Sequence, residues 1–311
     1  MMATFDIYAD MPWRKGTRLR LVSEADAPPA TRQVYDGIKS ALGLPVLHLY
    51  YPALGAYPEF LRLHWETVRE IARSQELFDA AERLRADAYT RTHNYFRVGD
   101  LRSYTSASPD GAASELATVA SYFHYRDPLV LLLFCYQMQA MEGQAGQVGV
   151  PATPRTGENA FDVVPDAVKD SITLDPLPKL LAEIRRAQEV PFVTPECCAF
   201  SRWPDFLKAY WQALKEMIAS PVYDECSYGV HETAWSLASQ LPGPAELTLD
   251  QMADAGLTAD QVASLAKILE LFVNHLSAQL LNISAAKIAL EGGNLPTPRH
   301  QRPGAKDQPA A

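Results

Sequence analysis

Apolar side chains recur at every third or fourth position along most of the chain, which is the spacing of one face of an α-helix. The segments TRQVYDGIKSALG (31–43) and PKLLAEIRRAQEV (178–190) show this spacing clearly. Each then meets a proline, which ends or interrupts a helix. Alternation with a period of two is rare, and no hairpin dipeptide lies between apolar runs. The pattern therefore predicts an all-α protein.

The apolar pattern is also repeated. LPVLHLYYPALGAYPEFLRLHW (44–65) superposes on VPFVTPECCAFSRWPDFLKAYW (190–211) after a shift of 146 residues, with Pro45 on Pro191, Pro58 on Pro204 and Trp65 on Trp211. Both copies close with a similar apolar segment, at 131–143 and 279–292. We expect two tandem bundles of about five helices each, packed against one another as a pseudo-dimer within one chain.

The repeat and the distribution of proline and glycine divide the chain into five parts. A linker rich in proline and glycine joins the two copies, and we expect it to be irregular. The polar, proline-rich end of the chain is expected to be disordered. The expected parts are an N-terminal extension (1–27), helical repeat 1 (28–143), the linker (144–178), helical repeat 2 (179–293) and the tail (294–311).

Composition excludes several classes of partner. The 311 residues carry a net charge of −9, so nucleic acid is not expected as a partner, because it requires a concentrated basic surface. The longest apolar run, LVLLLFCY (129–136), is far shorter than the roughly 20 residues of a membrane span and predicts a buried helix. The N-terminus has no apolar signal-peptide region, and the four cysteines form no CxxC pair. We expect a cytoplasmic protein that is not bound to a membrane.

Motifs for metals and cofactors are also missing from the sequence. HETAW (231–235) lacks the second histidine of a zinc HExxH site, and GQAGQVG (143–149) does not have the glycine spacing of a nucleotide loop. No GxSxG nucleophile motif occurs. We therefore expect neither a metal nor an organic cofactor.

Three stretches, LGLPVLHLYYPALGAYPEFL, VASYFHYRDPLVLLLF and AFSRWPDFLKAYW, together with the order of the repeats, resemble the group I D,L-2-haloacid dehalogenases. The resemblance covers roughly residues 28–293. It implies a pseudo-dimer with the active site between its halves, and hydrolysis of both enantiomers of small 2-halocarboxylic acids. In this family an activated water attacks C2 directly with inversion, without a covalent intermediate, and members form homodimers.

The resemblance also suggests which residues form the site. The aspartate that acts as the family's base falls on Glu196, and the asparagine that holds the water falls on Asp127. An aromatic pair that lines the substrate pocket falls on Val46 and Leu49, and a pocket tyrosine falls on Val130. All five positions differ from the family pattern, so the fold carries over better than the substrate does.

Four further polar or aromatic residues are candidates for substrate binding: His48, Tyr50, His124 and Asn282. His48 and Tyr50 lie in the first-copy counterpart of the Glu196 segment, and His124 lies just before Asp127. Asn282 is an amide in an apolar helix, so it must bond to a neighbouring helix or face a ligand. Structural explanations also exist, because Glu196 and Asp127 each stand where a carboxylate could stabilise the start of a helix.

Three functions follow as hypotheses. The first is displacement at an sp³ carbon of a small organic acid by a water that Glu196 deprotonates, with Asp127 as its partner. In the second, paired carboxylates bind an amino acid whose own amine expels halide or sulfate and closes an aziridine-type ring. The third is a catalytically inactive helical scaffold or accessory subunit.

Overall fold

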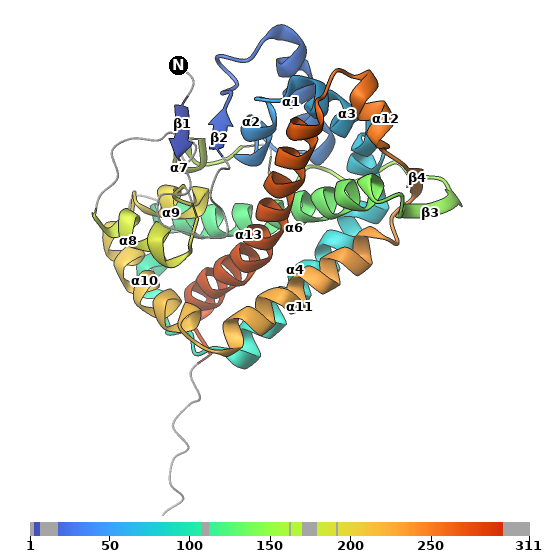
Figure 1. Cartoon of the computed structure of the whole chain (residues 1–311). Helices are drawn as coiled ribbons and strands as arrows, with labels where there is room; N and C mark the ends of the chain where they lie inside the picture. The colour runs from blue at the N-terminus through green and yellow to red at the C-terminus, as the bar shows by residue number, and fades with distance from the viewer. Residues whose placement is uncertain are drawn as a thin grey trace, which may run out of the picture.

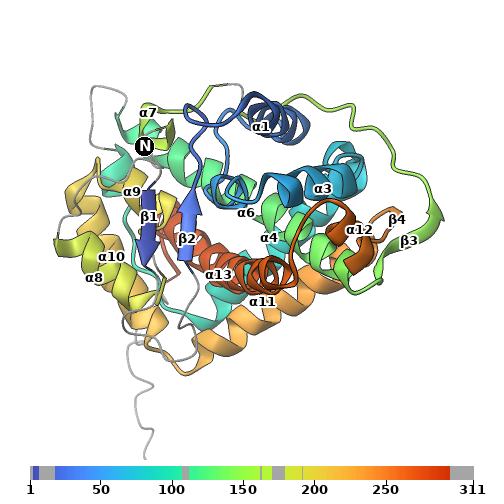
Figure 2. The same cartoon turned by 45° about the horizontal axis from the view of Figure 1, so that its top comes forward.

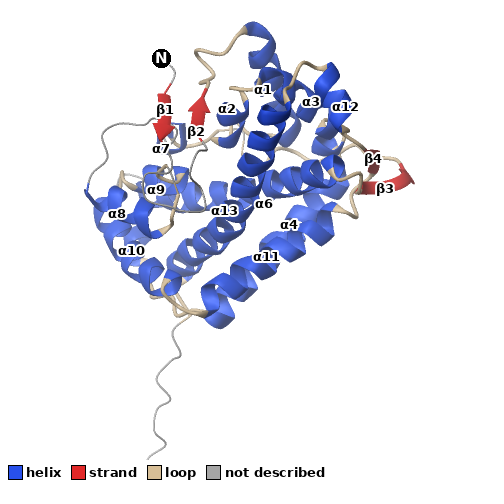
Figure 3. Cartoon of the chain, in the orientation of Figure 1, coloured by secondary structure: helices blue, strands red, loops and turns tan. Residues whose placement is uncertain are grey.

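The computed structural model describes residues 3–6, 18–106, 112–161, 163–169, 179–190 and 192–294. Most of this part of the chain is helical (Figure 3), which confirms the predicted all-α class. The predicted tail, apart from Asn294, about half of the predicted N-terminal extension and the last part of the predicted linker (170–178) lie outside the described residues. None of the helices described is both long enough and apolar enough to cross a membrane.

The helices of the first half begin and end where local signals predict. Proline occupies the first turn of two of them, and Gly43, with φ at 62°, closes the first. Ser74 caps the fourth by accepting a hydrogen bond from the backbone of Leu77. The elements are α1 (Pro29–Leu42), α2 (Tyr50–Leu54), α3 (Pro58–Val68), a 3₁₀ turn (Ile71–Arg73), α4 (Gln75–Tyr95), α5 (Ser103–Ser106) and α6 (Ala112–Met141).

The second half also begins its helices at prolines or threonines. Thr248 and Thr258 each form a reciprocal capping box with a glutamine three residues later. The elements are α7 (Asp166–Lys169), α8 (Lys179–Ala187), α9 (Pro195–Phe200), α10 (Pro204–Ile218), α11 (Val222–Ala238), α12 (Leu249–Asp254) and α13 (Ala259–Glu291).

Two short antiparallel strand pairs are present that the hydrophobic pattern does not predict. β1 (Ala3–Asp6) pairs with β2 (Arg18–Leu21), and β3 (Ala145–Val150) pairs with β4 (Gly243–Ala245). The expectation of an irregular linker is therefore wrong at β3 and α7. β3 carries no alternating signal because glycines take two of its six positions. Its pairing depends on backbone approach, since a Cβ on Gly146 would lie 3.0 Å from Gly243 Cα.

The centre of the molecule is the crossing of α6 and α13, its two longest helices (Figures 1 and 2). α4 and α11 run side by side and pack against both of them. α1–α3 lie toward one end of this arrangement, and α8–α10 lie toward another. The apolar run 129–136 is buried within α6, as the sequence predicts.

The interpretation of Asp127-Pro128 as the start of a helix is wrong, because both residues lie inside the 30-residue α6. Pro128 has no N–H to donate to the carbonyl of His124, which costs the helix one hydrogen bond. The helix continues because its flanking residues are buried against α13 and α4, and this packing outweighs the local loss. Asp127 therefore enters the core from the middle of a long helix rather than from its end.

Candidate active site

Glu196 and Asp127 meet at a single side-chain amide. Gln279 Nε2, from α13, lies 2.8 Å from Glu196 Oε2 and 3.0 Å from Asp127 Oδ2. Glu196 comes from the first turn of α9 and Asp127 from the middle of α6, and all three side chains are fully buried. Three helices thus bring the two carboxyl groups, which we call the acid pair, to one point of the core.

The orientation of the Gln279 amide follows from the charges around it. An amide nitrogen carries two donors, whereas the amide oxygen only accepts. Reversing the amide would place its oxygen against two carboxyl groups, so the nitrogen must face the acid pair. Gln279 Oε1 finds no hydrogen-bond partner among the described residues.

Arg126 supplies the positive charge of the site. Its Nε and Nη2 donate to Asp127 Oδ1 at 2.9 and 2.7 Å, and its guanidinium lies 4.6 Å from the centre of the Phe123 ring. Arg126 is also fully buried. A buried carboxylate is tolerated when it is paired and hydrogen-bonded, so Arg126 allows Asp127 to remain ionised.

The two carboxyl groups therefore differ in their affinity for a proton. Burial, with the negative charge of Asp127 as a smaller cause, raises the pKa of Glu196 to about 8. Burial also raises the pKa of Asp127, but the Arg126 charge and the Gln279 hydrogen bond oppose this rise. Glu196 forms no hydrogen bond with a cation among the described residues, so it is the member that holds a proton near neutral pH.

His48 lies beside this cluster, as the sequence analysis expects. Its Nε2 is 3.8 Å from Asp127 Oδ1, and its Nδ1 accepts the backbone N–H of Tyr50 at 3.3 Å. Burial, followed by the charges of Arg126 and His275, holds the pKa of His48 well below its usual value. The imidazole is therefore neutral at physiological pH.

Tyr50 is fully buried next to His48. Its ring stacks on Phe272 with 3.7 Å between centroids, and its hydroxyl is hydrogen-bonded to His275 Nδ1. Because His275 lies one turn before Gln279 on the same face of α13, Tyr50 packs next to the acid pair rather than within it.

The remaining candidates are more dispersed. Val46, Leu49 and Val130 are buried in the apolar core, where the Val46 carbonyl accepts the Tyr122 hydroxyl at 3.1 Å. These three side chains offer no polar group to a substrate. Their part in the site stays a prediction.

His124 and Asn282 have hydrogen-bond partners on other helices. His124 Nε2 pairs with the Ser284 hydroxyl at 3.2 Å, and burial lowers the pKa of His124 to about 3. Asn282 Oδ1 accepts the Tyr223 hydroxyl at 2.8 Å. Both residues therefore contribute to helix packing.

A cavity of about 340 Å³ lies along α13, and neither the acid pair nor Gln279 lines it. Its wall includes His275, Ala278 and Asn282 of α13 and Tyr223 of α11. Since His275 is one turn from Gln279, this cavity comes within one helical turn of the residue that bridges the acid pair.

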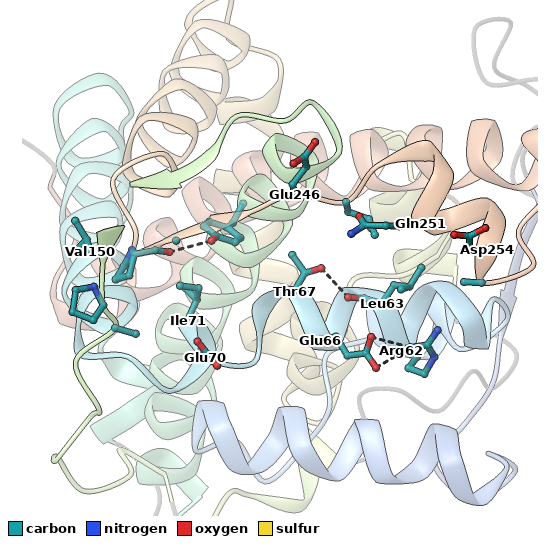
Figure 4. Close-up of a pocket in the computed structure, with 17 residues that line it drawn as sticks. Arg62, Leu63, Glu66, Thr67, Glu70, Ile71, Val150, Glu246, Gln251 and Asp254 are labelled. Atoms are coloured by element: carbon teal, nitrogen blue, oxygen red, sulfur yellow. Dashed lines mark hydrogen bonds and ion pairs between the residues drawn. The ribbon is translucent and has the colours of Figure 1, made fainter. Parts of the chain in front are cut away.

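A larger cavity of about 750 Å³ lies elsewhere, between α3, β3 and the segment leading into α12 (Figure 4). Four carboxylates contribute to its wall, and one of them, Glu66, is paired with Arg62 at 2.8 Å. Neither member of the acid pair lines it. The described residues also contain no group of three or more His, Cys, Asp or Glu side chains that could hold a metal ion.

Sequence reasoning missed Arg126 and Gln279. Each had a signal, because Arg126 is a charge within an otherwise apolar stretch and Gln279 is an amide in the same apolar helix as Asn282. What the sequence does not contain is the crossing of α6 and α13, which turns these two residues toward the acid pair.

Arg126→Met should lower the free energy of unfolding by about 3–5 kcal/mol at neutral pH, because it leaves the Asp127 carboxylate buried without its cation. The double variant Arg126→Met/Asp127→Leu should recover most of this loss, since it removes both charges. Urea unfolding of the three proteins measures both effects. Equal losses in the single and double variants would contradict the pairing.

Glu196→Gln should make stability less dependent on pH. The unfolded chain releases the Glu196 proton near pH 4.5, whereas the folded protein keeps it until about pH 8. The contribution of this group is therefore fully present below pH 4.5 and is lost as the pH rises toward 8. Between pH 5 and 8.5, urea unfolding should show the variant gaining stability relative to the wild type; parallel curves would contradict the raised pKa.

Comparison with known proteins agrees with the predicted family. A family model described as "Halocarboxylic acid dehydrogenase DehI" matches residues 45–197. An (R)-2-haloacid dehalogenase from Pseudomonas putida is 23% identical over 279 residues, which cover 86% of this chain and 92% of that protein. A second (R)-2-haloacid dehalogenase, from Rhizobium sp. (strain NHG3), is 24% identical over 243 residues, which cover 75% of this chain and 92% of that protein.

Solved structures show the same fold. The structure of a D-2-haloacid dehalogenase in complex with L-LA superposes with a TM-score of 0.80 at 22% identity, covering 88% of this chain and 97% of that one. A mutant of a D-2-haloacid dehalogenase in complex with D-2-CPA superposes with a TM-score of 0.79. The resemblance predicted from the sequence is thus confirmed: the family model, the two curated relatives and the shared fold all point to the DehI-type 2-haloacid dehalogenases.

Proposed function

We propose that the protein hydrolyses a small 2-halocarboxylic acid, with Glu196 as the general base. In the reaction, ionised Glu196 takes a proton from water while the water oxygen forms a bond to C2. The bond from C2 to the halogen breaks, and halide leaves with the electron pair. Because the oxygen comes from water directly, the products are a 2-hydroxy acid and halide, and no ester forms on the protein.

The observation that carries this proposal is the shared hydrogen bond of Glu196 and Asp127 to Gln279 in a fully buried setting. A base with a pKa of about 8 is well matched to a reaction near neutral pH, because it binds a proton strongly and is still ionised in a useful fraction of molecules. Glu196 Oε1 has no hydrogen-bond partner among the described residues, so it is the oxygen available to a water.

Asp127 has a different role in this proposal. Arg126 engages its Oδ1 and Gln279 engages its Oδ2. With both oxygens engaged, Asp127 acts as a positioning residue that fixes Gln279 and raises the pKa of Glu196. The asparagine that occupies this position in the family pattern is expected to hold the water itself. In this chain, by contrast, Asp127 would not contact the water.

We further propose that the site lies at the seam of a pseudo-dimer made by the two repeats. Asp127 comes from the first predicted repeat, whereas Glu196 and Gln279 come from the second. The order α1, α2, α3, α4, α6 in the first half resembles the order α8, α9, α10, α11, α13 in the second. Substrate would enter through the 340 Å³ cavity beside His275.

Hydrolysis is better supported than ring closure by a substrate amine. The ring-closure hypothesis depends on two uncompensated carboxylates that attract an ammonium group. Arg126 compensates Asp127, and Glu196 is protonated near neutral pH, so the cluster offers an ammonium little attraction. The scaffold hypothesis requires no activity at all and is separated from hydrolysis by the following experiment.

Glu196→Gln should lower the rate of halide release from 2-chloropropionate by about 10²- to 10⁴-fold, the usual contribution of a general base. Glu216→Gln, on the exposed side of α10, is the matched control and should keep the wild-type rate. Ion chromatography of halide, with circular dichroism to verify folding, measures the effect.

Each other outcome selects a different hypothesis. Wild-type halide release by Glu196→Gln would remove the base assignment. Halide release by the wild type only from an amino acid with a vicinal leaving group would favour ring closure. An inactive wild type with both kinds of substrate would favour the scaffold.

The pH dependence of kcat/KM should show the base directly. Glu196 acts only when ionised, so kcat/KM should rise about tenfold per pH unit below pH 8 and level off above it. Steady-state kinetics between pH 5.5 and 9.5 measure the profile. A profile that is flat across pH 6–9 would contradict this role of Glu196.

A further inference from the structure

Two buried residues beside Asp127 each carry a donor that has no hydrogen-bond partner among the described residues. Arg126 Nη1 and His48 Nε2 form no hydrogen bond with any described residue. Their side chains are 0% and 1% exposed. Buried donors in native proteins are nearly always satisfied by protein, water or a ligand, so this pair requires an explanation.

The protonation state of His48 follows from its other nitrogen. Nδ1 accepts the backbone N–H of Tyr50, so it carries no proton in the neutral ring. The proton of the neutral imidazole is therefore on Nε2, which makes that atom a donor. Asp127 Oδ1, at 3.8 Å, is too far away to accept a hydrogen bond from it.

The guanidinium of Arg126 is only partly used. Asp127 engages Nε and Nη2, and both donate to the same oxygen, Oδ1. Nη1 forms no hydrogen bond with a described residue, although the Tyr122 side chain interacts with this guanidinium. His48 Nε2 and the Arg126 fork both approach Asp127 Oδ1, so the two residues that carry the unused donors are neighbours of the same carboxylate.

With Glu196 protonated, the net charge of the cluster does not oppose the binding of an anion. Arg126 and Asp127 cancel, and a protonated Glu196 adds no charge. A guanidinium can hydrogen-bond two anions through different edges, and a neutral imidazole N–H can donate to one of them. When Glu196 ionises for the reaction, the cluster gains one negative charge, which the donors of Arg126 and His48 must offset if the anion is to stay bound.

We propose that Arg126 Nη1 and His48 Nε2 form a subsite for a small monovalent anion, either the carboxylate of the substrate or the halide that it releases. This inference rests on the proposed hydrolysis, because the substrate of that reaction and the halide that it releases are both anions. In the first case the subsite orients C2 toward the water on Glu196. In the second it stabilises the departing halide.

The test measures anion binding without turnover. Isothermal titration of the wild-type protein with propionate and with sodium bromide, alone and in competition, gives the Kd of each anion. His48→Phe keeps an aromatic ring but removes the donor, and Arg126→Lys keeps the charge but removes Nη1. Each should weaken binding at least tenfold, and His48→Gln should restore part of it by supplying an amide donor.

His64→Phe is the matched control. His64 is also fully buried with Nε2 unpartnered among the described residues, but its Nδ1 pairs with Gln137 at 3.0 Å in a cluster with Phe134. It should leave anion binding unchanged. For variants that fail to fold, the wild type labelled with ¹⁵N-histidine gives a second test, since the His48 imidazole signals should shift when propionate or bromide is added.

The outcomes separate the possible anions. Binding of propionate alone identifies a carboxylate subsite, binding of bromide alone identifies a halide subsite, and mutual competition identifies a shared one. Absence of binding to the wild type, or an unchanged Kd in both His48→Phe and Arg126→Lys, would overturn the proposal.

The subsite and the reaction can also fail separately. If the wild type releases halide and His48→Phe keeps the wild-type KM and anion affinity, the subsite is wrong and hydrolysis stands. If the wild type releases no halide but loses anion binding in these variants, hydrolysis is wrong and the subsite stands.

Discussion

The hydrogen bonds from the Gln279 amide to two carboxyl groups determine the rest of the site. They require α6, α9 and α13 to meet at one point, and they hold two acids close together away from water. Two ionised carboxylates in such a place would repel each other strongly. The protein resolves this conflict with one guanidinium and one retained proton, and the inequality between the acids makes one of them suitable as a base.

The site could be predicted from the sequence only in part. Helical spacing and capping residues are local signals, so they predict most helices, while the resemblance of three longer stretches suggested the family. The match to the family's motifs also led to Glu196 and Asp127. By contrast, the Asp127-Pro128 pair predicts a helix start, because a local rule cannot weigh the burial that carries α6 through the proline. β3 was missed for a related reason, since it is stabilised by a partner almost a hundred residues away.

Arg126 and Gln279 illustrate a different limit. A family resemblance assigns roles only to positions that match its motif. Arg126 and Gln279 lie outside those positions and act by hydrogen-bonding to residues that occupy them. Their importance depends on charge balance within the folded core. The hypothesis of an ammonium substrate was based on two adjacent acids. It did not include the positive charge of Arg126, which compensates one of them. A buried charge inferred from sequence therefore has to be assigned a counter-charge before its chemistry is interpreted.

The proposed duplication offers a reason why the acid pair occurs once. In the repeat alignment Tyr50 is the counterpart of Glu196, and aligning Glu142-Gly143 with Glu291-Gly292 makes His275 the counterpart of Arg126. Tyr50 and His275 are hydrogen-bonded to each other in the core, whereas their counterparts Glu196 and Arg126 are ionisable members of the acid cluster. A second buried set of charges would add a further desolvation penalty to a fold of modest net stability. A neutral pair at the equivalent place keeps the packing and concentrates the chemistry on one side of the seam.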